Sequence, residues 1–141
     1  MGLILDSSLL IAGEKKRFDL TGFLATRDDP VAMAAITASE LLHGCHRAAD
    51  VRQKRTRTEY VEWVLSEIDA IPFGLEEARH HARIWSEMAR AGQMIGSYDL
   101  LIAATALSLG YTVGTLNFQE FARVPGLVTI AENHLLSFRL R

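Results

Sequence analysis

Apolar and polar residues alternate in blocks along this chain, and each block has the length of a strand or a helix. Short apolar runs, typical of buried strands, occupy residues 3–6, 31–36, 112–115 and 127–130. The run at 70–73 contains a proline, which is tolerated at a sheet edge, so this segment could be an edge strand. The pattern therefore predicts several short strands spread over the whole sequence.

Helices are predicted between these runs. Apolar residues recur at intervals of three and four in the second half of 51–68, which marks one face of a helix. Residues 75–91 are strong helix formers that end at a glycine, and 97–109 is apolar almost all round, which is typical of a buried helix. Shorter helices are predicted at 9–12, 20–26 and 37–48.

Alternation of strands and helices predicts right-handed crossovers and a mostly parallel sheet that is covered on both faces. We therefore expect an α/β fold, a three-layer α/β/α sandwich around a central sheet, formed by one domain over residues 1–141. A hydrophobic fraction of 49% and a charged fraction of 23% fit such a globular chain.

Composition excludes several classes of protein. No apolar stretch reaches the length of a membrane span, no targeting segment is evident, and the single Cys45 cannot form an internal disulfide. These features fit a cytoplasmic protein without a membrane partner. A formal net charge of −2 argues against a protein that coats nucleic acid through bulk charge, so any phosphate contact must be local.

Three acidic residues, Asp6, Glu40 and Asp99, stand where apolar runs meet predicted helix starts. Strand-to-helix turns of a parallel sheet share its carboxyl edge, where adjacent strands are only about 4.8 Å apart, so these acids should crowd together. Two unit charges about 6 Å apart repel by roughly 3 kcal/mol at an effective dielectric of 20. A divalent cation would remove that repulsion, and oxygen ligands alone suit Mg²⁺ or Mn²⁺.

Each acid also has a purely structural explanation. Residues 37–40, Thr-Ala-Ser-Glu, match a capping box, Asp6 could be an N-cap, and Asp99 lies in a first helical turn, where the helix dipole favours an anion. Capping does not require three acids to fall at one edge of a sheet. The joint pattern therefore favours a metal site.

Four segments, in this order and spacing, resemble the motifs of PIN-domain ribonucleases: Asp6-Ser7-Ser8-Leu9-Leu10-Ile11, Ser39-Glu40-Leu41-Leu42-His43-Gly44, Tyr98-Asp99-Leu100-Leu101-Ile102-Ala103-Ala104 and Thr115-Leu116-Asn117-Phe118-Gln119-Glu120-Phe121. Within that family, the chain is most similar to the bacterial VapC toxins of toxin–antitoxin pairs, over essentially its whole length. The resemblance implies that Asp6, Glu40 and Asp99 are catalytic metal ligands supported by the hydroxyls of Ser8 and Thr115. It also implies an RNA substrate, a homodimer, and a small cognate antitoxin whose tail blocks the acidic cleft.

The chain departs from many relatives at one position. Asn117 stands where a fourth acid follows the last strand, and Glu120, three residues later, could supply a catalytic carboxylate from a short helix. The use of a second metal ion therefore depends on these two residues.

The implied reaction is endonucleolytic cleavage of RNA by a water molecule that the metal activates. Substrate phosphates could contact a cluster of basic residues, although such a run can equally be a solvated helix face. The cluster consists of Arg47, Arg52, Lys54, Arg55 and Arg57.

Other kinds of site find less support. His43, Cys45 and His46 are too few for a tetrahedral structural zinc site, and the chain has no P-loop and no Gly-x-Ser-x-Gly elbow. Three functions stay open: an Mg²⁺-dependent endoribonuclease toxin, a catalytically weak binding module that keeps the fold, and a housekeeping RNA-processing nuclease.

Overall fold

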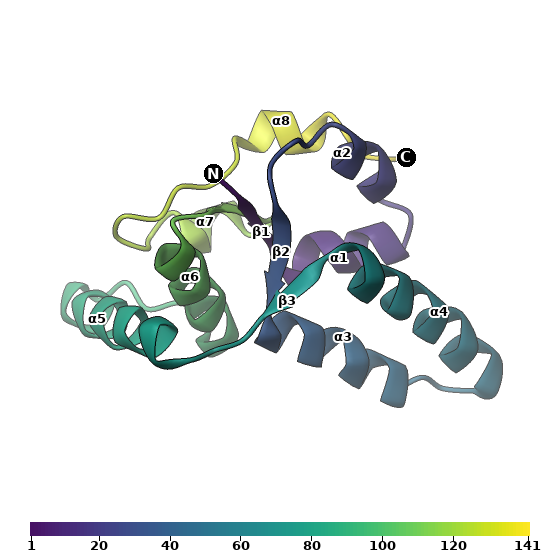
Figure 1. Cartoon of the computed structure of the whole chain (residues 1–141), viewed down its shortest axis with the longest axis horizontal. Helices are drawn as coiled ribbons and strands as arrows, with labels where there is room; N and C mark the ends of the chain where they lie inside the picture. The colour runs from purple at the N-terminus through teal and green to yellow at the C-terminus, as the bar shows by residue number, and fades with distance from the viewer.

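The computed structural model describes residues 1–141 and contains one four-stranded parallel sheet (Figure 1). The strand order is β3-β2-β1-β4, and Leu3 lies opposite Val31 and Thr112 in the two pairings that β1 makes. The predicted parallel sheet is confirmed. Its strands are β1 (Leu3–Leu5), β2 (Val31–Ala34), β3 (Asp69–Ile71) and β4 (Thr112–Gly114).

The strand expected at 127–130 is reduced to an isolated bridge between Val113 and Thr129. Two backbone hydrogen bonds flank it, from Val113 to Val128 and from Ile130 to Val113, both 2.9 Å. The chain turns in the left-handed region at Gly126, with φ 78°, just before this segment, and leaves for the next helix soon after it. Too few residues lie alongside β4 to extend the ladder.

Eight helices connect and flank the strands, and two of the three longest agree with the predicted bounds at both ends. The predicted start of the helix at 37 is wrong, because α3 begins at Ala35, directly after β2, without a side-chain cap. The predicted capping box at 37–40 is therefore also wrong. The helices are α1 (Ser7–Glu14), α2 (Leu20–Ala25), α3 (Ala35–His46), α4 (Val51–Glu67), α5 (Leu75–Ala91), α6 (Ser97–Leu109), α7 (Phe118–Phe121) and α8 (Glu132–Leu136).

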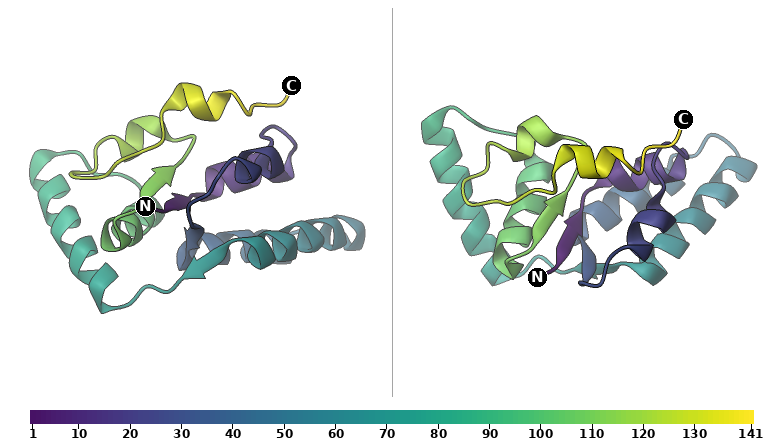
Figure 2. Two further views of the ribbon diagram at one scale, coloured as in Figure 1. Left: turned by 45° about the horizontal axis from the view of Figure 1, so that its top comes forward. Right: turned by 90° about the horizontal axis from the view of Figure 1, so that it is seen from above.

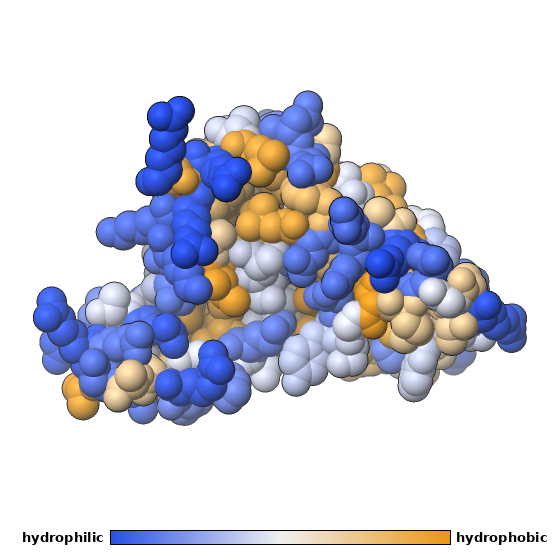
Figure 3. Space-filling view, turned by 180° about the vertical axis from the view of Figure 1, so that it is seen from behind, coloured by the Kyte–Doolittle hydropathy of each residue, from blue (hydrophilic) through white to orange (hydrophobic).

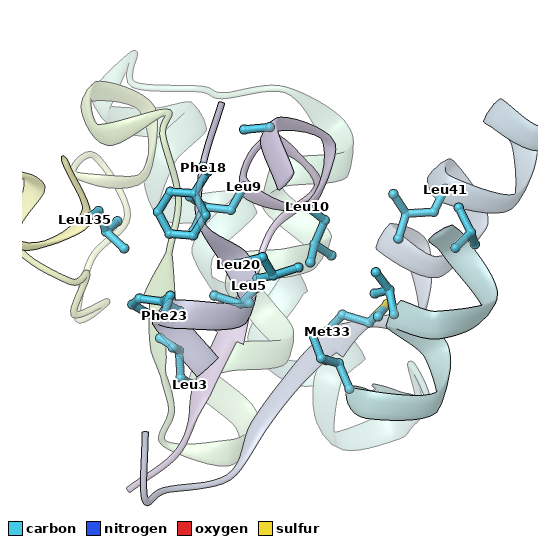
Figure 4. Packing of buried hydrophobic residues seen from close by; sticks show 14 of the residues in the cluster. Leu3, Leu5, Leu9, Leu10, Phe18, Leu20, Phe23, Met33, Leu41 and Leu135 are labelled. Carbon is cyan, nitrogen blue, oxygen red and sulfur yellow. The ribbon is translucent and has the colours of Figure 1, made fainter. Parts of the chain in front are cut away.

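The helices cover both faces of the sheet, so the predicted three-layer α/β/α architecture is confirmed (Figures 1 and 2). Side chains alternate along a strand, so Leu3 and Leu5 enter one core and Ile4 enters the other. The first core packs β1 and β2 against α1, α2, α3 and α4, and Leu135 of α8 joins it (Figure 4). The second core packs the sheet against α5, α6 and α7. None of the helices has the length and apolar character needed to cross a membrane.

The order of the strands determines where a ligand can reach the sheet edge. From β1 the chain proceeds outward to β2 and β3, and it then returns through α5 and α6 to place β4 on the other side of β1. The connections leave β1 and β4 in opposite directions, and such a switch point opens a crevice at the carboxyl ends of the strands. Because α6 leads back to the start of β4, its N-terminus lies at this same carboxyl edge.

Candidate active site

Asp6 follows β1 directly and lies at the switch point between β1 and β4. It is 1% exposed and caps α1, where the Leu9 N–H donates to its Oδ1 at 3.3 Å. The predicted N-cap is therefore confirmed. Burial raises the pKa of the Asp6 carboxyl, while its hydrogen bonds with Ser8, Thr115 and the Leu9 backbone oppose that rise.

Two hydroxyls hold the Asp6 carboxylate from opposite sides. Ser8 Oγ donates to Oδ1 at 2.6 Å, and Thr115 Oγ1, from the end of β4, donates to Oδ2 at 2.5 Å. These hydroxyls are themselves oriented by backbone donors, since the Leu116 N–H donates to Ser8 Oγ at 3.0 Å and the Asn117 N–H donates to Thr115 Oγ1 at 2.9 Å. The four groups lock one rotamer of Asp6 in place. Sequence reasoning missed the two backbone donors, because every residue except proline carries an N–H and none is marked by residue type.

Glu40 lies in the second turn of α3 and has no capping role. Its Oε1 is buried without a hydrogen-bond partner, which is costly for a carboxylate oxygen. Burial raises the pKa of Glu40, the negative charge of Asp6 adds to the rise, and the Ser7 side chain opposes it. Glu40 therefore lies within electrostatic reach of Asp6 and has no cationic partner.

Asp99 lies in the first turn of α6, as predicted, and is half-buried. Burial raises its pKa to about 7, and the neighbouring carboxylates of Glu120, Asp6 and Glu40 contribute to the rise. The structure thus brings Glu120 of α7 next to Asp99. None of these four acids forms an ion pair with a lysine or arginine, because the salt bridges of the chain all lie elsewhere.

Asn117 is exposed and lies at the N-terminal end of α7 without making a side-chain cap. Together with Glu120 and Glu132, it lines a cavity of about 360 Å³ beside the acids. Its neutral amide adds no charge to the site. The carboxylate nearest to Asp99 from this part of the chain is that of Glu120.

The donor set fits a divalent cation in its chemistry. Hard cations prefer carboxylate oxygens, and a cation would satisfy the unpartnered Glu40 Oε1. It would also offset the repulsion from neighbouring carboxylates that adds to the effect of burial on the pKa of Asp99. Asp6 accepts three hydrogen bonds, which leaves about one of its four acceptor positions for a ligand. As the side chains stand, no three acidic, histidine or cysteine groups converge tightly enough to ligate one ion.

The predicted basic residues divide into two sets. Arg47 and Arg57 line a cleft of about 180 Å³ together with Glu40. Arg57 is engaged there, since its Nε lies 3.3 Å from Glu14 Oε2 and its Nη1 donates to the Gly44 carbonyl at 2.9 Å. The other three are exposed on the first turns of α4 and do not line this cleft: Arg52, Lys54 and Arg55.

His43 and His46 are exposed, whereas Cys45 is buried and donates to the Leu41 carbonyl.

Comparison with known proteins agrees with this geometry, since residues 3–127 match the family model of the PIN domain. The chain belongs to the PIN domain family. Its relatives include the ribonuclease VapC of Rickettsia bellii, 36% identical over 127 residues, which are 90% of this chain and 93% of the relative. The tRNA(fMet)-specific endonuclease VapC of Salmonella typhimurium is 32% identical over 97 residues, 69% of this chain and 71% of the relative. The resemblance to VapC ribonucleases is thus confirmed.

Solved structures extend the likeness of this PIN domain to its three-dimensional form. DNA-bound VapBC from Salmonella typhimurium superposes with a TM-score of 0.84 at 27% identity, covering 92% of this chain and 97% of the other. VapBC2 from Rickettsia felis, bound to a DNA fragment from its promoter, gives 0.83 at 25% identity, covering 92% and 98%. The PIN fold of this chain is therefore shared along nearly all of its length.

Proposed function

We propose that this PIN-domain endoribonuclease acts in the cytoplasm as the toxin of a toxin–antitoxin pair and cleaves RNA with the help of Mg²⁺ or Mn²⁺. The observation that carries the metal proposal is the set of acids at the switch point. Asp6 raises the pKa of Glu40, and both raise that of Asp99. No cation of the chain forms an ion pair with them, and one Glu40 oxygen is buried without a partner. Oxygen ligands alone favour a hard cation over zinc.

Each acid has a separate role in this mechanism. Asp6 is the rigid anchor, because two hydroxyls and a backbone N–H hold its carboxylate. Glu40 and Asp99 complete the ligand set, and Glu120 supplies a further carboxylate beside Asp99. A divalent cation supplies Lewis-acid activation of water and neutralises charge on the phosphate. No side chain of the chain has to act as a nucleophile.

The test is cleavage of a labelled RNA by the purified protein with Mg²⁺, with Mn²⁺ and with a chelator. We expect cleavage with either cation and none with the chelator. Asp6→Asn and Asp99→Asn should each abolish cleavage, whereas Asp28→Asn, an exposed aspartate without a partner, should leave it unchanged. Equal cleavage with cation and with chelator would exclude the metal.

A catalytically weak binding module is the second candidate, and Asn117 is the observation that favours it. Under that function, growth inhibition would persist in the Asp6→Asn and Asp99→Asn variants. The position of Glu120 next to Asp99 supports the enzyme instead, because it restores a fourth carboxylate to the site.

The proposed partners are a small antitoxin and a second copy of the chain. Two solved relatives are VapBC complexes, which supports the antitoxin. An exposed aromatic row on and before α5 supports the homodimer, with His81 packed between Phe73 and Trp85 at centroid distances of 5.8 and 5.5 Å. Trp85 is 53% exposed, an unusual position for a tryptophan that has no partner surface.

A further inference from the structure

A groove follows helix α1 away from the acids. Ser8 and Ile11 of α1 and its C-cap residue Lys15 recur at intervals of three and four, so they lie on one side of the helix. All three line a cavity of about 420 Å³. Ser8 also donates to Asp6 at 2.6 Å. One end of the groove therefore touches the candidate active site.

Basic side chains border this groove. Lys15, Arg17 and Arg139 are exposed and line it, and none of them has a carboxylate within 4.0 Å. The two arginines come from opposite ends of the chain and are brought side by side by backbone pairing, in which the Leu140 N–H donates to the Arg17 carbonyl at 2.8 Å. Glu132 is the single acidic residue of the lining. In a chain of net charge −2, these cations form a local excess of positive charge.

The floor of the groove is apolar. Leu116, Phe118 and Leu136 line it together with Ile11, and Leu136 is 40% exposed. Figure 3, which views the molecule from behind, shows apolar surface in its upper half with hydrophilic side chains on either side. Charged borders and an apolar floor are the two features that bind single-stranded nucleic acid, since cations follow the backbone while bases lie on apolar or aromatic side chains.

We propose that the α1 groove binds a single-stranded segment of the RNA substrate next to the cleaved bond. Phosphates of that segment contact Lys15, Arg17 and Arg139, and its bases lie on Phe118 and the neighbouring aliphatic side chains. This inference rests on the proposed ribonuclease function and adds where the RNA lies. The cations expected on α4, Arg52, Lys54 and Arg55, are outside this groove and make no contact with the segment.

Charge and position favour RNA over a polypeptide in this groove. Each nucleotide carries one phosphate and one planar base, which match a cationic border and an apolar floor at the same time. The groove is also lined at one end by Ser8, whose hydroxyl donates to Asp6, beside which the phosphodiester must lie for cleavage. A polyanion without bases or apolar side chains, such as polyglutamate, would use the border and leave the floor without a ligand.

The test measures RNA binding separately from cleavage. In an Asp99→Asn background with chelator, anisotropy of a labelled oligouridylate is followed across a salt series. Replacing Lys15, Arg17 and Arg139 with alanine should lower the salt slope by about 2, because each phosphate contact to a single strand contributes about 0.7. The matched control replaces Arg52, Lys54 and Arg55, removes the same charge, and should leave the slope unchanged. An unchanged slope in the groove variant, or an equal change in both, would overturn the proposal.

A second measurement tests the floor. An abasic oligomer with the same number of phosphates should bind about tenfold more weakly than oligouridylate, because stacking on the floor is lost. Phe118→Leu, which keeps the apolar packing and removes the aromatic face, should reduce that difference. Equal affinity for both oligomers, or equally strong competition by polyglutamate, would show a site for any polyanion and contradict RNA as the occupant. Metal-dependent cleavage by the unmodified protein tests the proposed function independently of these outcomes.

Discussion

Asp6 shows how one residue performs two tasks. The same carboxylate caps α1 and faces the other acids of the site, so helix capping and catalysis do not compete for it. Thr115 and Ser8 make this possible, because their hydroxyls satisfy the buried oxygens and hold the rotamer. Groups that orient a metal ligand typically affect metal affinity or activity by about 10- to 100-fold.

Thr115→Val should therefore lower metal-dependent RNA cleavage by about 10- to 100-fold while the fold persists, because the shape is kept and the hydroxyl is lost. Steady-state cleavage and Mg²⁺ titration measure the effect. Thr105→Val is the matched control, since Thr105 is also buried and its hydroxyl donates only to the Leu101 carbonyl of its own helix. Similar losses in both variants would indicate a packing effect and contradict the positioning role.

The pKa of Asp99, raised to about 7, predicts how stability depends on pH. An acid with a raised folded-state pKa favours folding while it is protonated; that contribution is complete below pH about 4 and disappears as the pH rises through about 7. In chelator, the Tm should thus fall between pH 5 and pH 8, and each 1 kcal/mol lost corresponds to roughly 3 °C in a domain of this size. Scanning fluorimetry of Asp99→Asn should show a flatter profile.

Asp29 provides the control for this pH profile. The hydrogen bond from Arg27 holds the pKa of Asp29 below its usual value, so its contribution is complete above pH about 4 and is lost only as the pH falls further. Asp29→Asn should therefore leave the slope between pH 5 and 8 unchanged. If the Tm of Asp99→Asn fell as steeply between pH 5 and 8 as that of the parent chain, Asp99 would not be the group that causes the pH dependence.

At the scale of elements, side chains of α4 hold together α1 and α3, the helices next to Asp6 and Glu40. Arg57 contacts Glu14 at the end of α1 and the Gly44 carbonyl of α3, and the Tyr60 hydroxyl donates to the Leu10 carbonyl of α1. Asp6 precedes α1 and Glu40 lies on α3, so these contacts of α4 help to set the position of one acid relative to the other.

Tyr60→Phe should lower the free energy of unfolding by about 1 to 2 kcal/mol, because the partly buried Leu10 carbonyl loses its side-chain donor. Urea denaturation measures the change. Tyr98→Phe serves as the control, since Tyr98 is 52% exposed, and its variant should unfold within about 0.5 kcal/mol of the parent chain. If Tyr60→Phe left the free energy of unfolding unchanged, this hydrogen bond would not stabilise the packing of α4 against α1.

At the scale of the whole molecule, the C-terminal segment completes a core that begins at β1. The PIN match ends at residue 127, yet Leu135 is fully buried among residues of α1 and α2 (Figures 2 and 4). Phe138 packs on Phe18 and Phe23, with ring centroids 6.2 and 5.3 Å apart. The segment thus closes the first core and also forms one side of the α1 groove.

Leu135→Ala should destabilise the protein by about 2 to 5 kcal/mol through a cavity in this core, whereas Leu136→Ala, at an exposed neighbouring position, should cost less than about 1 kcal/mol. Thermal and urea unfolding of the pair compare the same chemical change in two environments. Equal effects would mean that α8 is not part of the cooperative core.

Local chemistry made much of this molecule predictable. The bounds of α5 and α6 follow from helix formers and from the glycines that end them in the left-handed region, Gly92 and Gly110, with φ 67° and 68°. The parallel sheet follows from the alternation of apolar runs with helices. The short segment at 127–130 and helix α8 were not predicted correctly, because pairing of a few residues and docking of one leucine depend on distant partners.

The sequence by itself determined the order of most elements, the layers and the place of the three acids at strand-to-helix junctions, since periodicity and residue type carry that information. The resemblance to PIN-domain ribonucleases added the supporting hydroxyls of Ser8 and Thr115. Only the tertiary structure decided that Glu40 has no capping role, that Glu120 lies beside Asp99, and that Arg17 and Arg139 share one groove. These facts depend on the switch in strand order and on contacts between residues far apart in the chain. No local pattern encodes them, because the free energy that fixes such contacts arises only when the layers pack together.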